Sequence, residues 1–115
     1  MKKKATPSGA VEREYRRLRE SLAQTGYISQ GSVLDHSTLR PPRSGYQWTR
    51  KVAGKTITVA LSQDQFRALL QAIQNKRHLQ QTIGKMEKLS RQILFEAHPD
   101  TQRHKPVRKK TFGLI

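Results

Sequence analysis

The sequence contains no cysteine, so it can form no disulfide, no thiolate metal site and no thiol nucleophile. Long apolar runs are missing too. The longest apolar stretch near the middle, Ile57-Thr58-Val59-Ala60-Leu61, is far shorter than the roughly 20 residues that a membrane-spanning helix needs. No apolar signal segment follows the lysines at residues 2–4. We therefore expect a cytoplasmic protein, with association with the nucleoid left open.

Acidic residues are scarce, with 8 Asp and Glu against 23 Lys and Arg, a net charge of +15 over 115 residues. Such a charge attracts polyanions, and nucleic acid is the commonest polyanion inside a cell. The shortage of acids also disfavours a metal-dependent nuclease, whose site needs several carboxylates. Since only 34% of the residues are apolar, the chain can build one small core between polar ends.

A basic tail, residues 1–7, precedes the first predicted helix, which Ser8 can cap. The apolar residues of this helix recur at spacings of four, three and four residues. They are Val11, Tyr15, Leu18 and Leu22. This spacing places all four side chains on one narrow face, and charged residues cover the rest. A narrow stripe suits one partner helix rather than a broad core.

The strongest β signal lies in residues 46–61, where large and polar side chains alternate on both sides of Ala53 and Gly54. If a two-residue turn joins the strands, Trp48 faces Val59, and one face collects the large apolar groups. The other face then collects polar residues, namely Gln47, Thr49, Lys51, Thr56 and Thr58. A bulged turn stays open as an alternative, because the favoured two-residue turns require a positive φ at Ala53.

The segment before this hairpin is less regular. Residues 25–34 indicate a bend followed by a short strand at residues 32–34. Residues 35–44, which include Pro41 and Pro42, indicate a surface loop without ladder hydrogen bonds of its own.

Ser62 and Gln65 match a capping box, which starts a helical pattern that continues to about Ala97. Two apolar stripes follow one another along it. The first is Phe66, Leu69, Leu70 and Ile73, and we expect it to pack on the apolar face of the hairpin. The second is Leu79, Ile83, Met86, Leu89 and Ile93, and we expect it to pack on the first helix or on a second copy. Whether residues 62–97 form one helix or two stays open.

Together these elements predict an α+β fold with an N-terminal helix, a short antiparallel β-hairpin or meander, a long C-terminal helical segment and basic flexible tails. We expect a single small domain over residues 8–97. The basic tails are residues 1–7 and 98–115.

Three groups of basic residues are candidates for contacts with nucleic-acid phosphates. The hairpin tip carries Arg50, Lys51 and Lys55 beside a row of threonines. On the long helix, Arg77, Lys88 and Arg91 line up opposite the second apolar stripe. The C-terminal tail contributes Arg103, Lys105, Arg108, Lys109 and Lys110, the composition of an arm that binds by releasing counterions. For each group the simpler interpretation is a solvated, solubilising surface.

Other side chains are weaker candidates. Trp48 and Tyr46 could stack on bases, but the alternation places them on the apolar face, so we expect them in the core. The four histidines lack a metal-binding spacing, and we expect no metal, no cofactor and no enzymatic activity. Three apolar residues near the end of the chain, Phe112, Leu114 and Ile115, could dock in a pocket or on a sheet edge.

Four short motifs carry a resemblance. They are Gly31-Ser32, Tyr46-Gln47-Trp48, Lys51-Val52-Ala53-Gly54-Lys55-Thr56 and Ile73-Gln74-Asn75-Lys76-Arg77. This pattern resembles a group of small bacterial proteins associated with mobile elements and transposases. The resemblance implies a bacterial cytoplasmic protein with a role beside transposition or integration, and it supplies no catalytic residue. Members often carry cysteines before the tyrosine strand, whereas residues 35–44 have none, which argues against a metal site there.

The sequence thus predicts a non-catalytic nucleic-acid-binding accessory protein of a mobile element or integration system. It would bind DNA rather than RNA, through sequence-tolerant phosphate contacts. The alternative is an interaction subunit whose positive charge serves only steering or solubility. In that case a partner protein or a second copy pairs with the two apolar stripes. The stripe of the first helix is Val11, Tyr15, Leu18 and Leu22, and that of the long helix is Leu79, Ile83, Met86, Leu89 and Ile93.

Overall fold

The computed structural model of the chain describes residues 7–99, and these fall into two compact units. The sheet unit comprises residues 25–79. The helix-pair unit comprises residues 7–24 and 80–99. Each unit is described by itself below. The expectation of a single domain over residues 8–97 stays a prediction.

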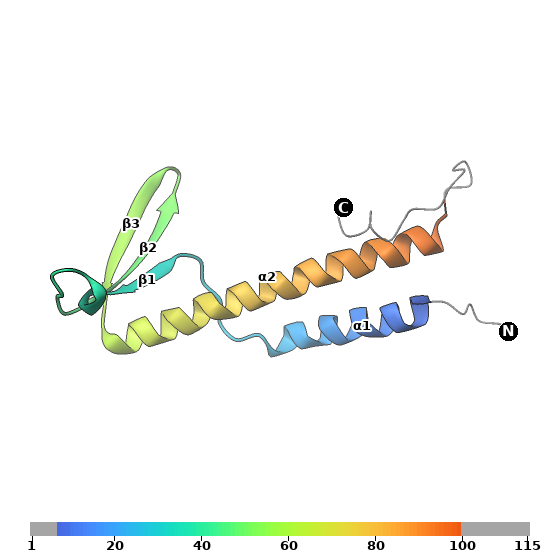
Figure 1. Ribbon diagram of the computed structural model, residues 1–115, viewed down its shortest axis with the longest axis horizontal. Coiled ribbons are helices and arrows are strands. Elements are labelled where there is room, and N and C mark those ends of the chain that lie inside the picture. The colour runs from blue at the N-terminus through green and yellow to red at the C-terminus, as the bar shows by residue number, and fades with distance from the viewer. Residues whose placement is uncertain (1–6, 100–115) are drawn as a thin grey trace. The chain divides into compact units, whose positions relative to one another are not determined.

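The fold is α+β, as the sequence predicts (Figure 1). In chain order the elements are α1 (Pro7–Ser21), the 3₁₀ turn η1 (Leu22–Gln24), β1 (Ser32–Asp35), the 3₁₀ turn η2 (His36–Thr38), β2 (Tyr46–Val52), β3 (Lys55–Leu61) and α2 (Gln63–Ala97). The open question about residues 62–97 is answered, because α2 is one continuous helix. Among the described residues, none of the helices combines the length and apolarity needed to cross a bilayer.

The sheet unit holds an antiparallel sheet in the order β1-β2-β3. Trp48 pairs with Val59, so the predicted hairpin register is confirmed. Ala53 and Gly54 form the two-residue turn, with φ values of 51° and 79°. Positive φ at both central residues is the geometry that matches the twist of a tight hairpin. Ala53 therefore adopts the left-handed conformation, and the bulged alternative does not occur.

The expectation that residues 35–44 form no ladder hydrogen bonds is wrong at the start of that segment. Asp35 belongs to β1 and pairs with Tyr46 of β2, and the His36 amide donates to the Gly45 carbonyl at 2.9 Å. The Asp35 carboxylate accepts a 2.9 Å hydrogen bond from the Ser37 amide and so caps η2. That bond, followed by one from the Ser37 hydroxyl, holds the pKa of Asp35 below its ordinary value.

The first part of α2 starts as predicted and anchors the sheet at one end. The Ser62 hydroxyl accepts from the Gln65 amide at 3.1 Å, and the Gln65 side chain accepts from the Ser62 amide at 2.9 Å. This reciprocal pair is a capping box. The Tyr46 and Phe66 rings lie 4.7 Å apart, which joins the base of the hairpin to the first turn of α2.

Within the sheet unit, the chain before β1 is joined to α2 by two hydrogen bonds of its backbone groups. The Ser29 amide donates to the carbonyl of Ala72 at 3.2 Å, and the Asn75 side chain donates to the carbonyl of Tyr27 at 2.9 Å. Ala72 and Ile73 are the buried apolar residues of this unit. The small core of the sheet unit therefore lies where α2 meets the extended chain before β1.

The apolar face of the hairpin is covered only at its base. Ile57 and Val59 stay 42% and 44% exposed, and Trp48 is half-buried. The first apolar stripe of α2 meets the hairpin at Phe66, whose ring lies 4.7 Å from that of Tyr46, while Ile57 and Val59 stay open. The distal half of the hairpin stands away from the helix (Figure 1). Trp48 is thus a partly exposed residue rather than a core residue.

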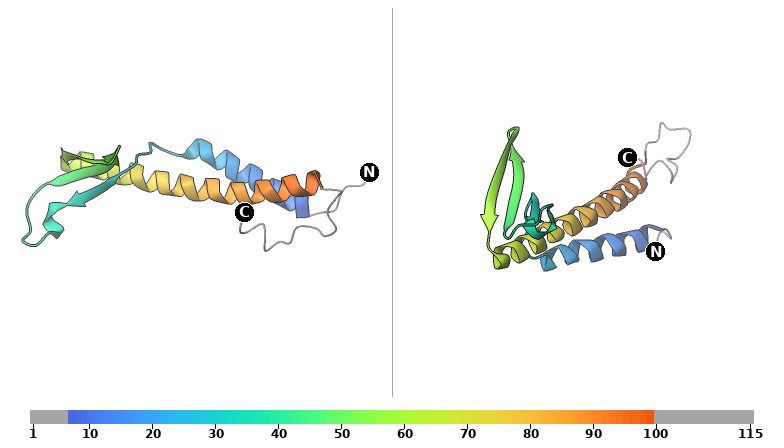
Figure 2. Two further views of the ribbon diagram at one scale, coloured as in Figure 1. Left: turned by 90° about the horizontal axis from the view of Figure 1, so that it is seen from above. Right: turned by 60° about the vertical axis from the view of Figure 1, so that its left-hand side comes forward.

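In the helix-pair unit, α1 lies antiparallel beside residues 80–97 of α2 (Figures 1 and 2). Leu18 of the predicted α1 stripe is buried, at 6% exposure. On α2 the buried residue is Thr82, at 5%, whereas Ile83 is 41% exposed. Within one chain Ile83 is therefore only partly covered, and its packing on a second copy stays a prediction. Thr82 and Ile83 both fit a helical spacing between Leu79 and Met86, and the residue that the structure buries is Thr82.

The start of α1 also differs from the expectation. The helix begins at Pro7, so Ser8 lies inside the first turn and does not precede it. Proline is well suited to the first helical turn, because its fixed φ is helical and its missing amide would have no intrahelical partner.

Candidate nucleic-acid interface

The polar face of the sheet is built by side-chain alternation. Because the register pairs Thr49 with Thr58 and Lys51 with Thr56, these four side chains share one face with Ser32 of β1. Every residue of β3 other than Leu61 is exposed, as is Lys51. The face therefore presents hydroxyl groups and an ammonium group to solvent.

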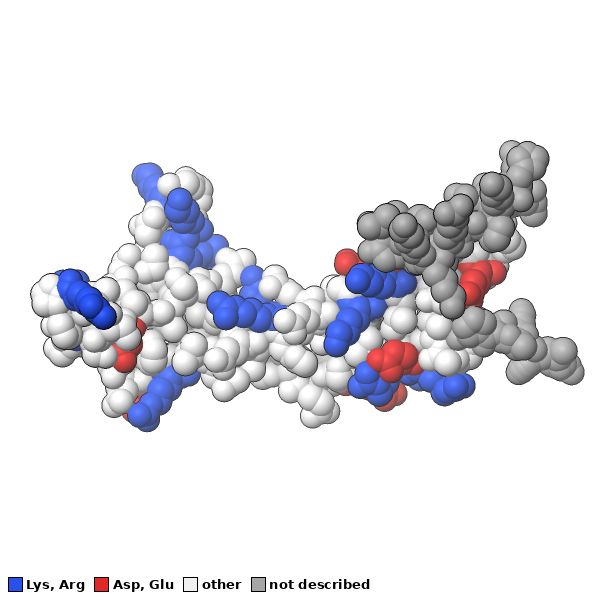
Figure 3. Space-filling view, viewed as in Figure 1, with Lys and Arg blue, Asp and Glu red and all other residues white. Residues whose placement is uncertain are grey.

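A shallow hollow of about 370 Å³ lies on this face, which we call the sheet hollow. It is lined by Gln30, Gly31, Ser32, Thr49, Arg50, Lys51 and Thr56. None of these seven lining residues is acidic, and the sequence has no Asp or Glu between positions 36 and 63. On the face that Figure 3 shows, Lys and Arg side chains and no acidic ones gather over the end of the hairpin. Hydroxyls and cations without a competing carboxylate are suited to phosphate oxygens.

Gly31 allows the chain before β1 to form one wall of this hollow. Its φ is +101°, a region that favours glycine. A Cβ atom at this position would lie 2.5 Å from Trp48 Nε1 and 2.7 Å from the Thr49 carbonyl oxygen. Trp48 Nε1 donates to the Gln30 carbonyl at 2.9 Å and so holds the chain against β2. Trp48 thus positions the hollow from the opposite face of the sheet.

Side-chain hydrogen bonds order the middle of the polar face. His36 Nε2 lies 2.9 Å from Gln47 Oε1, and Gln47 Nε2 donates to the Thr49 hydroxyl oxygen at 3.3 Å. His36 Nδ1 is 3.4 Å from the Ser44 carbonyl oxygen, so the loop before β2 joins this chain of contacts. Because Thr49 accepts from Gln47, its hydroxyl hydrogen is left to donate outward.

The structure separates the three predicted cations of the hairpin tip. Lys51 projects from the polar face, whereas Arg50 and Lys55 belong to the face of Ile57. Lys51 and Lys55 are exposed. Arg50 is half-buried, and its Nε is a buried nitrogen without a hydrogen-bond partner among the described residues. Arg50 is also a lining residue of the sheet hollow, but its side chain belongs to the opposite face of β2, so the cation that this hollow presents is Lys51.

The predicted cations of α2 fall in different units. Arg77 is exposed and belongs to the sheet unit, and Lys88 and Arg91 belong to the helix-pair unit. Lys88 is exposed, but Arg91 is half-buried and its Nε is also buried and without a partner among the described residues. A common surface for the three stays a prediction. The predicted cations of the C-terminal tail lie outside the described residues. They are Arg103, Lys105, Arg108, Lys109 and Lys110.

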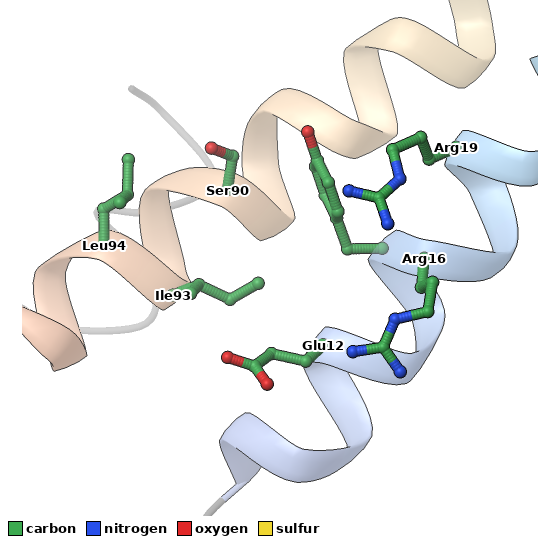
Figure 4. A pocket seen from close by; sticks show the side chains of 7 residues that line it. Glu12, Arg16, Arg19, Ser90, Ile93 and Leu94 are labelled. Carbon is green, nitrogen blue, oxygen red and sulfur yellow. The ribbon is translucent and has the colours of Figure 1, made fainter.

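A second hollow, the helix-pair groove, lies between α1 and the second part of α2 (Figure 4). It is lined by Glu12, Tyr15, Arg16, Arg19, Ser90, Ile93 and Leu94. The nearby Glu14 carboxylate pairs with the Arg17 guanidinium, and this hydrogen bond lowers the pKa of Glu14. The mixture of both signs of charge makes this groove less suited to a polyanion than the sheet hollow.

The described residues hold no group of three or more His, Asp or Glu side chains placed to bind a metal ion. Lys51 and the threonines of the polar face were predicted from the sequence, whereas the lining residues Gln30 and Ser32 were not. The signal that could have found them is Gly31, whose position just before a short strand indicates a close approach of two backbones.

The comparisons with known proteins give no further information about this interface. No family model, no curated protein and no solved structure matches the chain.

Proposed function

We propose that the protein is a non-catalytic nucleic-acid-binding accessory protein that serves the DNA of a mobile element or integration system in the bacterial cytoplasm. The sheet hollow carries this proposal, because it combines Lys51 and several hydroxyl groups with no acidic lining residue. Contacts of this kind bind phosphate and carry no sequence information. The protein would therefore bind DNA of many sequences with similar affinity.

The net charge of +15 supports the same function. A chain with this charge is drawn to a polyanion over a distance of about 10 Å at moderate salt, and the hollow then offers directed hydrogen bonds. The exposed Lys55, the α2 cations Arg77 and Lys88, and the basic tail would add phosphate contacts outside the hollow. The preference for DNA over RNA comes from the resemblance to mobile-element proteins.

The test is a binding titration of the full chain with duplex DNA, single-stranded DNA and RNA over a series of salt concentrations. We expect Lys51→Gln to weaken duplex binding and to reduce the slope of log K against log salt by about 0.9, the value for one lost phosphate contact. The matched control is Lys85→Gln, which makes the same change at an exposed lysine of the helix-pair unit. Equal effects of the two substitutions would exclude the sheet hollow as the binding site.

One observation favours the alternative function of a helix-pairing interaction subunit. The α1 stripe and the second part of α2 pair within one chain, yet Leu94 of the helix-pair groove stays 53% exposed. Ile83, which lines another hollow together with Tyr15, stays 41% exposed. In this alternative a partner helix covers these side chains and the charge only steers association. It predicts no binding to any of the three nucleic acids at moderate salt.

A further inference from the structure

The outer edge of β3 is the longer of the two sheet edges. In the order β1-β2-β3 both β1 and β3 have one unpaired side. β1 has four residues and ends at the charged Asp35, which are two ways in which proteins protect an edge. β3 has seven residues, and all but Leu61 are exposed. Its sequence contains no proline, glycine or acidic residue, and its single charge is Lys55 at the start.

The hairpin turn determines which backbone groups of β3 point outward. In a two-residue hairpin the residues that flank the turn, here Val52 and Lys55, form a hydrogen-bonded pair, and such pairs then alternate along the ladder. The amide and carbonyl groups of Thr56, Thr58 and Ala60 therefore point away from β2. Among the described residues no backbone hydrogen bond from outside the strands reaches these three residues.

We propose that β3 pairs antiparallel with β3 of a second copy of this chain, with Thr58 opposite Thr58 of the second copy. This register brings together all the outward-pointing backbone groups, because Thr56 then lies opposite Ala60 and each pair exchanges two hydrogen bonds. Two three-stranded sheets become one sheet of six strands, and neither copy keeps an open β3 edge.

The side chains of β3 fit a second copy of the same strand. Ile57 lies opposite Val59 of the second copy in a pair without backbone hydrogen bonds, where side chains approach most closely. Both residues are more than 40% exposed in the single chain, so the pairing buries apolar surface that α2 leaves open. Lys55 lies opposite Leu61, so no like charges face each other directly. A peptide with acidic side chains is a less suitable partner for this edge, because Lys55 is the single charged residue of β3.

The pairing also extends the polar face. In the dimer, Thr49 and Thr58 of one copy form a row across the sheet with Thr58 and Thr49 of the second copy. The two sheet hollows therefore lie on one continuous surface. The pairing rests on the strand edge and not on the proposed nucleic-acid binding. A dimer that binds no nucleic acid would support the pairing and contradict the proposed function. A monomer that binds nucleic acid would do the reverse.

Disulfide cross-linking tests the proposed register directly. Because the sequence has no cysteine, a single introduced cysteine can form a disulfide only with its counterpart in a second copy. In the proposed pair the two Thr58 Cα atoms are about 5.5 Å apart, within the range of about 4.4–6.8 Å that a disulfide bridges. The two Thr56 Cα atoms are displaced by four residues along the strands, about 14 Å. We expect Thr58→Cys to form a covalent dimer under mild oxidation and the matched control Thr56→Cys to stay largely monomeric.

Sedimentation of the full chain over a concentration series is the second measurement, with circular dichroism as the check of folding. We expect a reversible dimer that Thr58→Lys weakens about five-fold or more, because it places two like charges opposite each other. Thr56→Lys adds the same charge opposite Ala60 and should have a smaller effect. A monomer at every concentration, equal effects of the two lysine substitutions, or equal cross-linking of the two cysteine variants would overturn the proposal.

Discussion

Gly31→Ala tests the close approach that forms one wall of the sheet hollow. The new methyl group would lie 2.5 Å from Trp48 Nε1, 2.9 Å from Trp48 Cε2 and 2.7 Å from the Thr49 carbonyl oxygen. The indole and the β2 backbone cannot both move aside, because Trp48 bonds to Gln30 and Thr49 is paired on both sides in the sheet. The left-handed φ of +101° adds strain for any residue with a Cβ atom.

The expected cost can be built from these parts. A left-handed conformation costs a non-glycine residue about 1–2 kcal/mol. Loss of the Trp48 hydrogen bond to Gln30 adds about 1 kcal/mol. We therefore expect Gly31→Ala to lower the free energy of unfolding of the sheet unit by about 2–3 kcal/mol. It should also weaken nucleic-acid binding, because the wall of the hollow moves.

The assay is chemical denaturation followed by the fluorescence of Trp48, the single tryptophan of the chain. The matched control is Gly84→Ala. Gly84 lies inside α2, and a Cβ atom there would meet nothing within 4 Å. This change should raise helix stability by up to about 1 kcal/mol, as circular dichroism would show. A Gly31→Ala variant within about 0.5 kcal/mol of the parent would refute the close approach, since even the smallest strain expected there is larger.

Three further predictions concern the turn, the cap and the helix pair. Ala53→Asn should raise the free energy of unfolding by about 0.5–1 kcal/mol, because asparagine tolerates the left-handed φ of 51° better than alanine. A loss of stability would contradict the assigned turn. Ser62→Ala should cost about 1 kcal/mol in the same assay, because it removes the acceptor of the Gln65 amide, and an unchanged midpoint would show that the cap is not formed. Leu18→Asp should unfold the helix pair in thermal circular dichroism, whereas Ile83→Asp should be tolerated, because Leu18 is 6% exposed and Ile83 is 41% exposed. Equal losses in both variants would mean that Ile83 is packed after all.

The parts of the fold that depend on local rules could be predicted from the sequence. The alternation on both sides of Ala53 predicted the hairpin register, because a shift by one residue would have moved the large side chains of one strand to the polar face. Ser62 and Gln65 marked the start of α2, because capping depends on residues three positions apart. The same local information placed Thr49 and Lys51 on one face.

The rest depended on contacts between distant segments. Ile83 is more apolar than Thr82, so a hydrophobicity pattern selects it, but the geometry of the antiparallel pair buries Thr82. The strand pairing of Asp35 depends on Tyr46, eleven residues away, and residues 35–44 carry no local signal for it. The wall of the sheet hollow depends on the fit of Gly31 against Trp48, which no periodicity reports.

The central claim is that the chain binds nucleic-acid phosphates, and the salt dependence of duplex binding tests it most directly. The full chain is titrated with DNA duplexes of different sequence over a range of salt. We predict similar affinities for all duplexes and a linear fall of log K with log salt, with a slope of about −0.9 for each phosphate contact. Deleting the residues after Ala97 should make this slope shallower without unfolding the described units. Absence of binding to every duplex at moderate salt would contradict the claim.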